Sequence, residues 1–153
     1  MKSKLTFEWK HLKKHPKIYS GDRAYISFII NGKPLSELLL GGVGNNIGNF
    51  GWGINLKYEL DEFERLKKGK KSNSENGLFS AYVCAECGDE GCGAVMFRIL
   101  ETENTIEWKD FVWSDGHFDK NEPDEKIEIN PIIFDKGEYN IALSELKLKI
   151  SEQ

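Results

Sequence analysis

Residues 78–113 read LFSAYVCAECGDEGCGAVMFRILETENTIEWKDFVW and predict three consecutive β-strands. The first strand, residues 78–84, is apolar on both faces, as a central strand would be. The second, residues 93–100, follows a cysteine-rich turn, and the third, residues 105–113, follows the polar turn ETEN. Because the connections are short, neighbouring strands are expected to pair in antiparallel fashion. The stretch therefore predicts an antiparallel meander.

The third of these strands changes the parity of its aromatic residues. Ile106 and Trp108 share one face, whereas Phe111 and Trp113 fall on the opposite face of a regular strand. One extra residue at positions 109–110 would place all four side chains on the same side of the sheet. We therefore predict a β-bulge at Lys109-Asp110.

The first half of the chain predicts one strand, one short helix and a glycine-rich connection. Residues 24–32 place Ile26, Phe28 and Ile30 on one face and end in Asn-Gly, which is typical of a strand followed by a turn. Residues 34–40 predict a short helix with its proline in the first turn. Residues 41–53 contain six glycines and no phosphate-binding motif. We interpret them as a mobile connection pinned by Phe50 and Trp52, with a ligand-gripping loop as the alternative.

Two longer helices and one further strand complete the predicted elements. Residues 57–68 carry acidic residues early and lysines late, which suits the helix dipole, and Leu56, Leu60, Phe63 and Leu66 predict its apolar stripe. Residues 126–134 predict a strand that Pro131 restricts to an edge or an end. The last helix follows Asp135 as its cap, with Glu138 in capping-box position. Its apolar stripe consists of Tyr139, Ala142, Leu143, Leu146 and Ile150.

Length and composition bound the fold and the partners. The chain has 153 residues, the size of one domain, so we expect a single domain over residues 1–153. The elements predict an α+β fold, a mainly antiparallel β-sheet with two or three helices packed on it. The formal net charge is −4, unlike the basic excess of phosphate-binding surfaces, so we expect no nucleic-acid partner. Neither a signal peptide nor an apolar span is visible, and we expect a cytoplasmic protein with no membrane partner.

All three cysteines lie in the turn between the first two strands of the meander or at its border, where Cys84 ends the first strand. Cys84 and Cys87 have the spacing of a zinc knuckle, and Cys92 returns on the opposite arm. If the meander is antiparallel, the third strand ends near this turn and brings His117 towards the thiols. Three cysteines and one histidine are an accepted set of ligands for a closed zinc site. The sequence thus predicts zinc bound by Cys84, Cys87, Cys92 and His117.

Two other readings of the cysteines stay open. Reduced cysteines also pack as small hydrophobic residues in protein cores. Cys84 and Cys87 could instead form a redox pair, but the thioredoxin-like motif normally lies near a βαβ unit, and the sequence predicts none. The acidic neighbours Glu86, Asp89 and Glu90 oppose a thiolate, since negative charge raises the pKa of a thiol.

The cysteine turn and three other segments resemble a family of small bacterial proteins for which no activity is established. The resemblance is carried by YVCAECGDEGCGAVMFRI (82–99), TIEWKDF (105–111), FDKGEYNIAL (134–143) and, more loosely, INGKPLSELL (30–39). Ala85 departs from the shared pattern, in which proline is common. The resemblance implies no substrate, catalytic residue or partner for this chain.

Three hypotheses on function follow from the sequence. The leading one is a non-catalytic binding or regulatory module, in one form an immunity-type protein, with a protein partner and a structural cysteine hairpin. Its grounds are the small size, the acidic balance and the lack of a recognisable catalytic constellation in the sequence. The alternatives are a thiol-based oxidoreductase that uses Cys84 and Cys87, and a metal-dependent enzyme with an open zinc position.

Overall fold

The computed structural model describes residues 2–12, 23–39, 42–43, 46–68, 78–85, 93–114 and 125–152. The strands are β1 (Leu5–Leu12), β2 (Arg23–Ile30), β3 (Lys33–Pro34), β4 (Asn46–Gly48), β5 (Phe79–Cys84), β6 (Ala94–Glu101), β7 (Thr105–Ser114), β8 (Glu125–Lys126) and β9 (Ile132–Asp135). The helices are α1 (Leu35–Leu38), α2 (Leu56–Lys68) and α3 (Lys136–Ser151). The fold is α+β with antiparallel strand pairs, as the sequence predicts.

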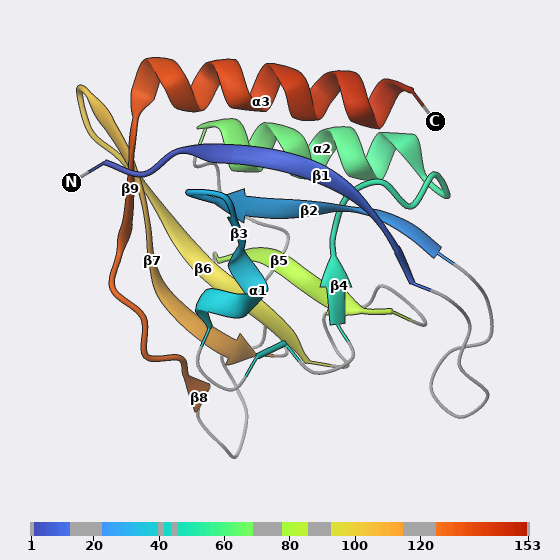
Figure 1. Cartoon of the computed structure of the whole chain (residues 1–153), viewed down its shortest axis with the longest axis horizontal. Helices are drawn as coiled ribbons and strands as arrows, with labels where there is room; N and C mark the ends of the chain where they lie inside the picture. Colours follow the sequence, from blue (N-terminus) through green and yellow to red (C-terminus); the bar gives the residue numbers. More distant parts are fainter. Residues whose placement is uncertain are drawn as a thin grey trace.

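The strands form two sheets, which Figure 1 shows beside the two longer helices. One sheet has the order β1-β2-β3, and the other the order β4-β5-β6-β7-β8 with β9 also paired to β7. β8 and β9 both pair with β7, since Val112 of β7 opposes Lys126 and Trp108 of β7 opposes Ile132. The predicted strand 126–134 is therefore split in two. Pro131 lies in the gap, where its missing N–H costs no ladder hydrogen bond.

Isolated bridges join the two sheets at both sides. The Ser3 N–H donates to the Ile133 carbonyl at 2.6 Å, beside the bridge between Ser3 and Phe134. On the other side, the Ile26 N–H donates to the Phe50 carbonyl at 2.8 Å. The pairings therefore run in a circuit from β1 through β2, β4, β5, β6, β7 and β9 back to the start of β1. Both sheets face one shared core.

The centre of that core is aromatic. Phe28 of β2 contacts Phe7, Phe50, Tyr82 and Trp108 edge-on, with ring centroids 5.9–6.2 Å apart. Rings in this geometry stabilise one another beyond the area that they bury. Phe28 thus connects the small sheet to three separate segments of the rest of the fold.

β1 is an element that sequence analysis missed. The lysine-rich composition around it is typical of a solvated segment, yet Leu5 and Phe7 are buried and Trp9 packs against the core. Glu8 and Lys10 alternate with them and are exposed. This period of two is the ordinary signature of a half-buried strand, and the charge of its outer face concealed it.

The glycine-rich stretch contains β4 and a close approach to β2. Phe50 is fully buried and the Trp52 indole N–H donates to the Gly48 carbonyl at 2.8 Å, so the predicted role of both aromatics is confirmed. Gly51 has φ +91°, and a Cβ there would come within 2.8 Å of the Ile26 side chain. Only glycine fits at this position without displacing the strand. The described part of the stretch is a packed segment.

The predicted bulge in β7 is confirmed. Between Met96 and Arg98, β7 carries one residue more than β6, and Asp110 takes φ +56°. As a result Ile106, Trp108 and Phe111 are all buried in the main core, against which Trp113 also packs. An extra residue restores the parity of the aromatic side chains, as a β-bulge does.

The two longer helices differ in how well the sequence predicts them. In α3 the Asp135 carboxylate accepts from the Glu138 N–H at 3.0 Å, and all five residues of the predicted stripe are buried. In α2 the predicted stripe is partly wrong, because Leu56 is 53% exposed while Glu59 is buried. The Glu59 carboxylate accepts the N–H groups of Gly51 and Gly53, at 2.6 and 3.1 Å. This pairing satisfies a carboxylate that the core would otherwise exclude.

A hydrogen-bonded tyrosine joins both helices to the sheet. The Tyr139 hydroxyl of α3 donates to the Leu66 carbonyl in the last turn of α2, at 2.6 Å. The Trp108 indole N–H of β7 donates to the same hydroxyl at 3.3 Å. Carbonyls in the last turn of a helix lack partners within it, so Tyr139 supplies one.

In the described part of the chain, no helix is long and apolar enough to cross a membrane.

Candidate functional site

The ends of the strands that border the cysteine turn lie together at one end of the larger sheet. Cys84 ends β5, and Ala94 begins β6 directly opposite Ser114, the last residue of β7. The antiparallel order expected for the meander is thus confirmed. The end of β7 returns to the cysteine end of the sheet, which was the topological premise for bringing His117 there.

The predicted zinc ligands themselves are only partly described. Cys84 is half-buried and is paired in register with Asn46 of β4. Cys87, Cys92 and His117 lie outside the described residues. Among the residues that the structure does describe, no group of three or more potential ligands could hold a metal ion. The zinc site therefore stays a prediction, and of its four predicted ligands only Cys84 is described, at the end of β5.

Asn46 holds the base of this hairpin together and was missed by sequence analysis. Its side-chain amide donates to the Gly93 carbonyl at 3.0 Å and to the Tyr82 carbonyl at 3.4 Å. These two carbonyls belong to the two arms that lead into and out of the cysteine turn. Such side-chain bonds to the backbone fix the separation of the arms. The one available sequence signal was an asparagine among glycines, which is also ordinary in loops.

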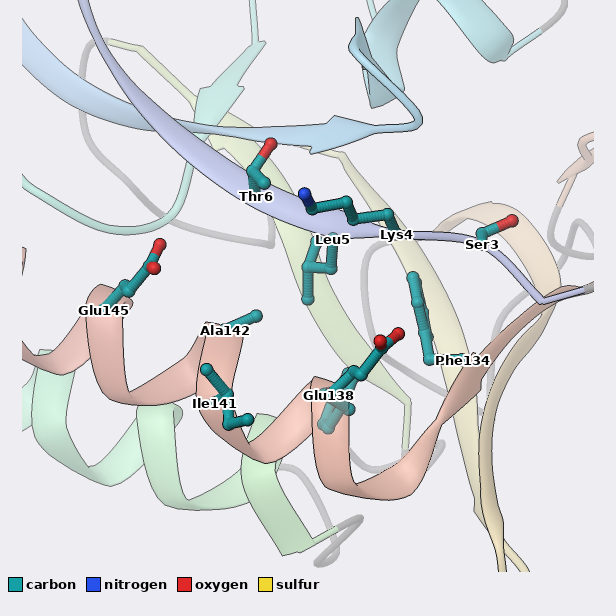
Figure 2. Close-up of a pocket in the computed structure, with 10 residues that line it drawn as sticks. Ser3, Lys4, Leu5, Thr6, Phe134, Glu138, Ile141, Ala142 and Glu145 are labelled. Carbon is teal, nitrogen blue, oxygen red and sulfur yellow. The ribbon is translucent and has the colours of Figure 1, made fainter.

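A second candidate site is a groove between β1 and α3, shown in Figure 2. The groove has a volume of about 280 Å³. Its strand wall comprises Ser3, Lys4, Leu5 and Thr6, and its helix wall Glu138, Ile141, Ala142 and Glu145, with Phe134 and Tyr139 completing the lining. In Figure 1, β1 and α3 run alongside each other from the N-terminal side of the molecule.

The strand wall of the groove is an open sheet edge. The Asn31 N–H donates to the Lys4 carbonyl, so in β1 the even-numbered residues direct their backbone groups towards β2. The odd-numbered residues direct theirs away, as the Ser3 N–H does towards β9. Beyond Ser3, the backbone groups of Leu5, Phe7 and Trp9 on this side bond to no other backbone group of the described chain. Among the residues that the structure describes, they form an edge without a paired strand on the side of β1 away from β2.

The exposed face of α3 that includes the helix wall alternates acidic and apolar residues and continues beyond the groove. Glu138, Ile141, Glu145 and Leu148 follow one another at intervals of three or four residues, so they lie along one face of α3. Ile141 is 66% exposed and Leu148 65% exposed, although the opposite stripe of the same helix already fills the core. The helix is thus apolar on its buried side and again on part of its exposed side.

The charged groups of the groove include two carboxylates on its helix wall. Within the described chain, neither the Glu138 nor the Glu145 carboxylate forms an ion pair, and Lys4 pairs with neither of them. Figure 2 shows both carboxylates rising from the helix towards the strand. At the floor, burial raises the pKa of Tyr139 above its usual range, so this residue is a neutral hydrogen-bonding group. The groove therefore presents negative charge at its helix wall.

Sequence analysis missed this groove for a physical reason. It arises from the apposition of residues 3–6 and residues 138–145, which lie at opposite ends of the chain and share no local pattern. The available signal was Ile141 and Leu148 outside the apolar stripe of the last helix. Single exposed aliphatic residues are common, so that signal alone indicates little.

Comparison of the chain with protein-family models, with curated proteins and with solved structures finds no match. The resemblance of the cysteine hairpin therefore stays a prediction.

Proposed function

We propose that this protein is a non-catalytic binding module that receives a partner protein in the groove between β1 and α3. The observation that carries the proposal is the free backbone edge of β1 beside a helix that exposes Ile141 and Leu148. Free strand edges invite pairing with another chain. Exposed aliphatic groups beside a groove supply apolar area that a partner can bury.

The cysteine hairpin has a structural role in this proposal. Asn46 already ties the arms of the hairpin together at their base, and Cys84 ends a strand whose preceding residues are buried in the core. Zinc at the tip would fix the conformation of the turn in the same sense. An immunity-type protein, which inhibits a toxin by binding it, is one form of such a module.

Site-specific photocrosslinking tests the proposal. A photoreactive amino acid is introduced at Ile141 and, as a matched control, at the exposed Glu128 near β8. In cells that naturally produce the protein, position 141 should yield one dominant crosslinked partner that position 128 does not yield. The partner is then purified and its binding to the unmodified protein is measured by calorimetry.

The decisive variant is Ile141→Glu. Because Ile141 is 66% exposed, this change should leave the midpoint of thermal unfolding nearly unchanged. It should weaken binding of the purified partner by about tenfold or more, since an aliphatic contact is replaced by a charge that must be desolvated. Unchanged affinity of the variant, or equal crosslinking at both positions, would overturn the proposed site.

A further inference from the structure

We infer that the occupant of the groove is an extended segment of the partner that adds to β1 as a further strand and directs basic side chains at Glu138 and Glu145. The inference rests on the proposed function and specifies how the partner is held. Three features carry it, namely the hydrogen-bonding pattern of the strand, the shape of the groove and the charge of the helix.

The backbone of β1 offers a periodic set of bonds. Leu5, Phe7 and Trp9 each direct one N–H and one carbonyl away from β2, whereas the residues between them bond within the sheet. An added strand meets such an edge with hydrogen bonds at every second residue. The main-chain bonds supply affinity with little regard to sequence, as in other cases of strand addition.

The groove has the form that strand addition requires. One wall is a strand edge and the other is a helix that runs alongside it, with Leu5 and Ala142 between them (Figure 2). A helix approaching this groove would leave the edge unpaired, because its own backbone groups are already bonded. An extended segment satisfies the edge and presents alternate side chains to α3.

The helix wall determines which side chains fit. Glu138 and Glu145 are exposed carboxylates two helical turns apart, and the aliphatic Ile141 lies between them. Glu152 extends the acidic series beyond Leu148. Lys or Arg side chains complement the carboxylates, and an aliphatic side chain between them covers Ile141. Arginine adds a second hydrogen bond where it meets a carboxylate edge-on.

The test uses a displayed library of random dodecapeptides selected on the intact protein. Enriched peptides should carry at least two basic residues flanking an aliphatic one. For the best of them, Glu138→Gln and Glu145→Gln should each weaken binding about two- to fivefold, the range expected for exposed ion pairs. The control Glu128→Gln removes the same charge near β8, on the opposite side of the molecule from α3 in Figure 1, and should leave the affinity unchanged.

N-methylation of the peptide backbone, one residue at a time, identifies strand addition directly. Methylation of every second residue should lower the affinity about tenfold or more, because it removes a bond to β1, while methylation of the residues between should have little effect. Sensitivity without this period of two, or failure to enrich any peptide that binds the groove, would overturn the inference. The proposed function would still stand if the crosslinked partner loses affinity for Ile141→Glu, so the two failures are distinguishable.

Discussion

At the scale of single residues, polar groups inside the core decide how the elements are joined. The Tyr139 hydroxyl connects β7, α3 and α2, and the Glu59 carboxylate holds two glycine N–H groups of the loop before α2. Neither role is visible in the sequence, because each depends on a partner from another element. The Asp135 cap, by contrast, depends on a residue three positions away, and the sequence predicts it correctly.

Removal of the Tyr139 hydroxyl tests the hydrogen bonds that connect β7, α3 and α2. Tyr139→Phe should lower the free energy of unfolding by about 1–3 kcal/mol, because the Leu66 carbonyl and the Trp108 N–H lose a buried partner. Tyr82→Phe is the matched control. The Tyr82 hydroxyl is also buried, but within the described chain it lies near Ser36 without the geometry of a hydrogen bond. Urea unfolding should show the loss for Tyr139 and a near-neutral change for Tyr82.

The same tyrosines predict a loss of stability at alkaline pH. Burial raises the pKa of Tyr82 and of Tyr139 above the usual value of about 10. The unfolded chain therefore releases these protons first, so the free energy of unfolding is independent of them below pH about 10 and falls as the pH rises further. Each contributes a slope of at most about 1.4 kcal/mol per pH unit. Urea unfolding of the Tyr82→Phe/Tyr139→Phe double variant should show a shallower decline, and an identical decline would contradict this assignment.

At the scale of elements, the sequence predicted those helices and strands whose formation depends on residues close together in the chain. The terminal helix and the bulge in β7 follow from the spacing of apolar residues within one segment. β1 was missed because the charged residues on its outer face are typical of a solvated segment, although buried and exposed residues alternate along the strand. β4 was missed because its three residues, Asn46–Gly48, are held by pairing with β5, and a single isoleucine between an asparagine and a glycine is too short a signal to predict a strand.

The cap of α3 is tested by substitution at its first residue. Asp135→Ala should lower the free energy of unfolding by about 0.5–2 kcal/mol, because the Glu138 N–H loses its acceptor. Asp135→Asn retains an acceptor oxygen and should cost much less. The ion pair between Asp135 and Lys2, 3.8 Å apart and exposed, contributes little to either result. Equal denaturant midpoints for the wild type and both variants would contradict the cap.

The zinc prediction belongs to the cysteine hairpin and calls for a measurement of metal content. Protein purified without chelator or added metal should contain about one zinc ion per chain if Cys84, Cys87, Cys92 and His117 form a closed site. Cys87→Ala should remove the metal, and His117→Ala should weaken its binding less, because water can replace imidazole. A content below about a tenth of an ion per chain would leave the cysteines as packed, protonated thiols.

At the scale of the whole molecule, the fold class could be predicted from the sequence, but the pairing that joins the two sheets into a circuit could not. The α+β composition and antiparallel order follow from the segments, but the circuit of strands depends on bridges at Ser3 and Ile26 to distant residues. The groove has the same origin, since β1 diverges from β9 after Ser3 and α3 lies alongside it. Non-local contacts of this kind leave no periodic trace in a sequence.

Residue-resolved hydrogen exchange of β1 tests the open edge most directly and needs no partner. The amides of Thr6, Glu8 and Lys10 face β2 and should exchange slowly. The amides of Leu5, Phe7 and Trp9 face the free edge and should exchange at least about a hundredfold faster in the isolated protein, as expected of amides without a hydrogen bond. Bound partner should protect this second set and leave the first unchanged. Equal protection of all six amides in the free protein would show that the edge is already paired, and would contradict the proposed binding site.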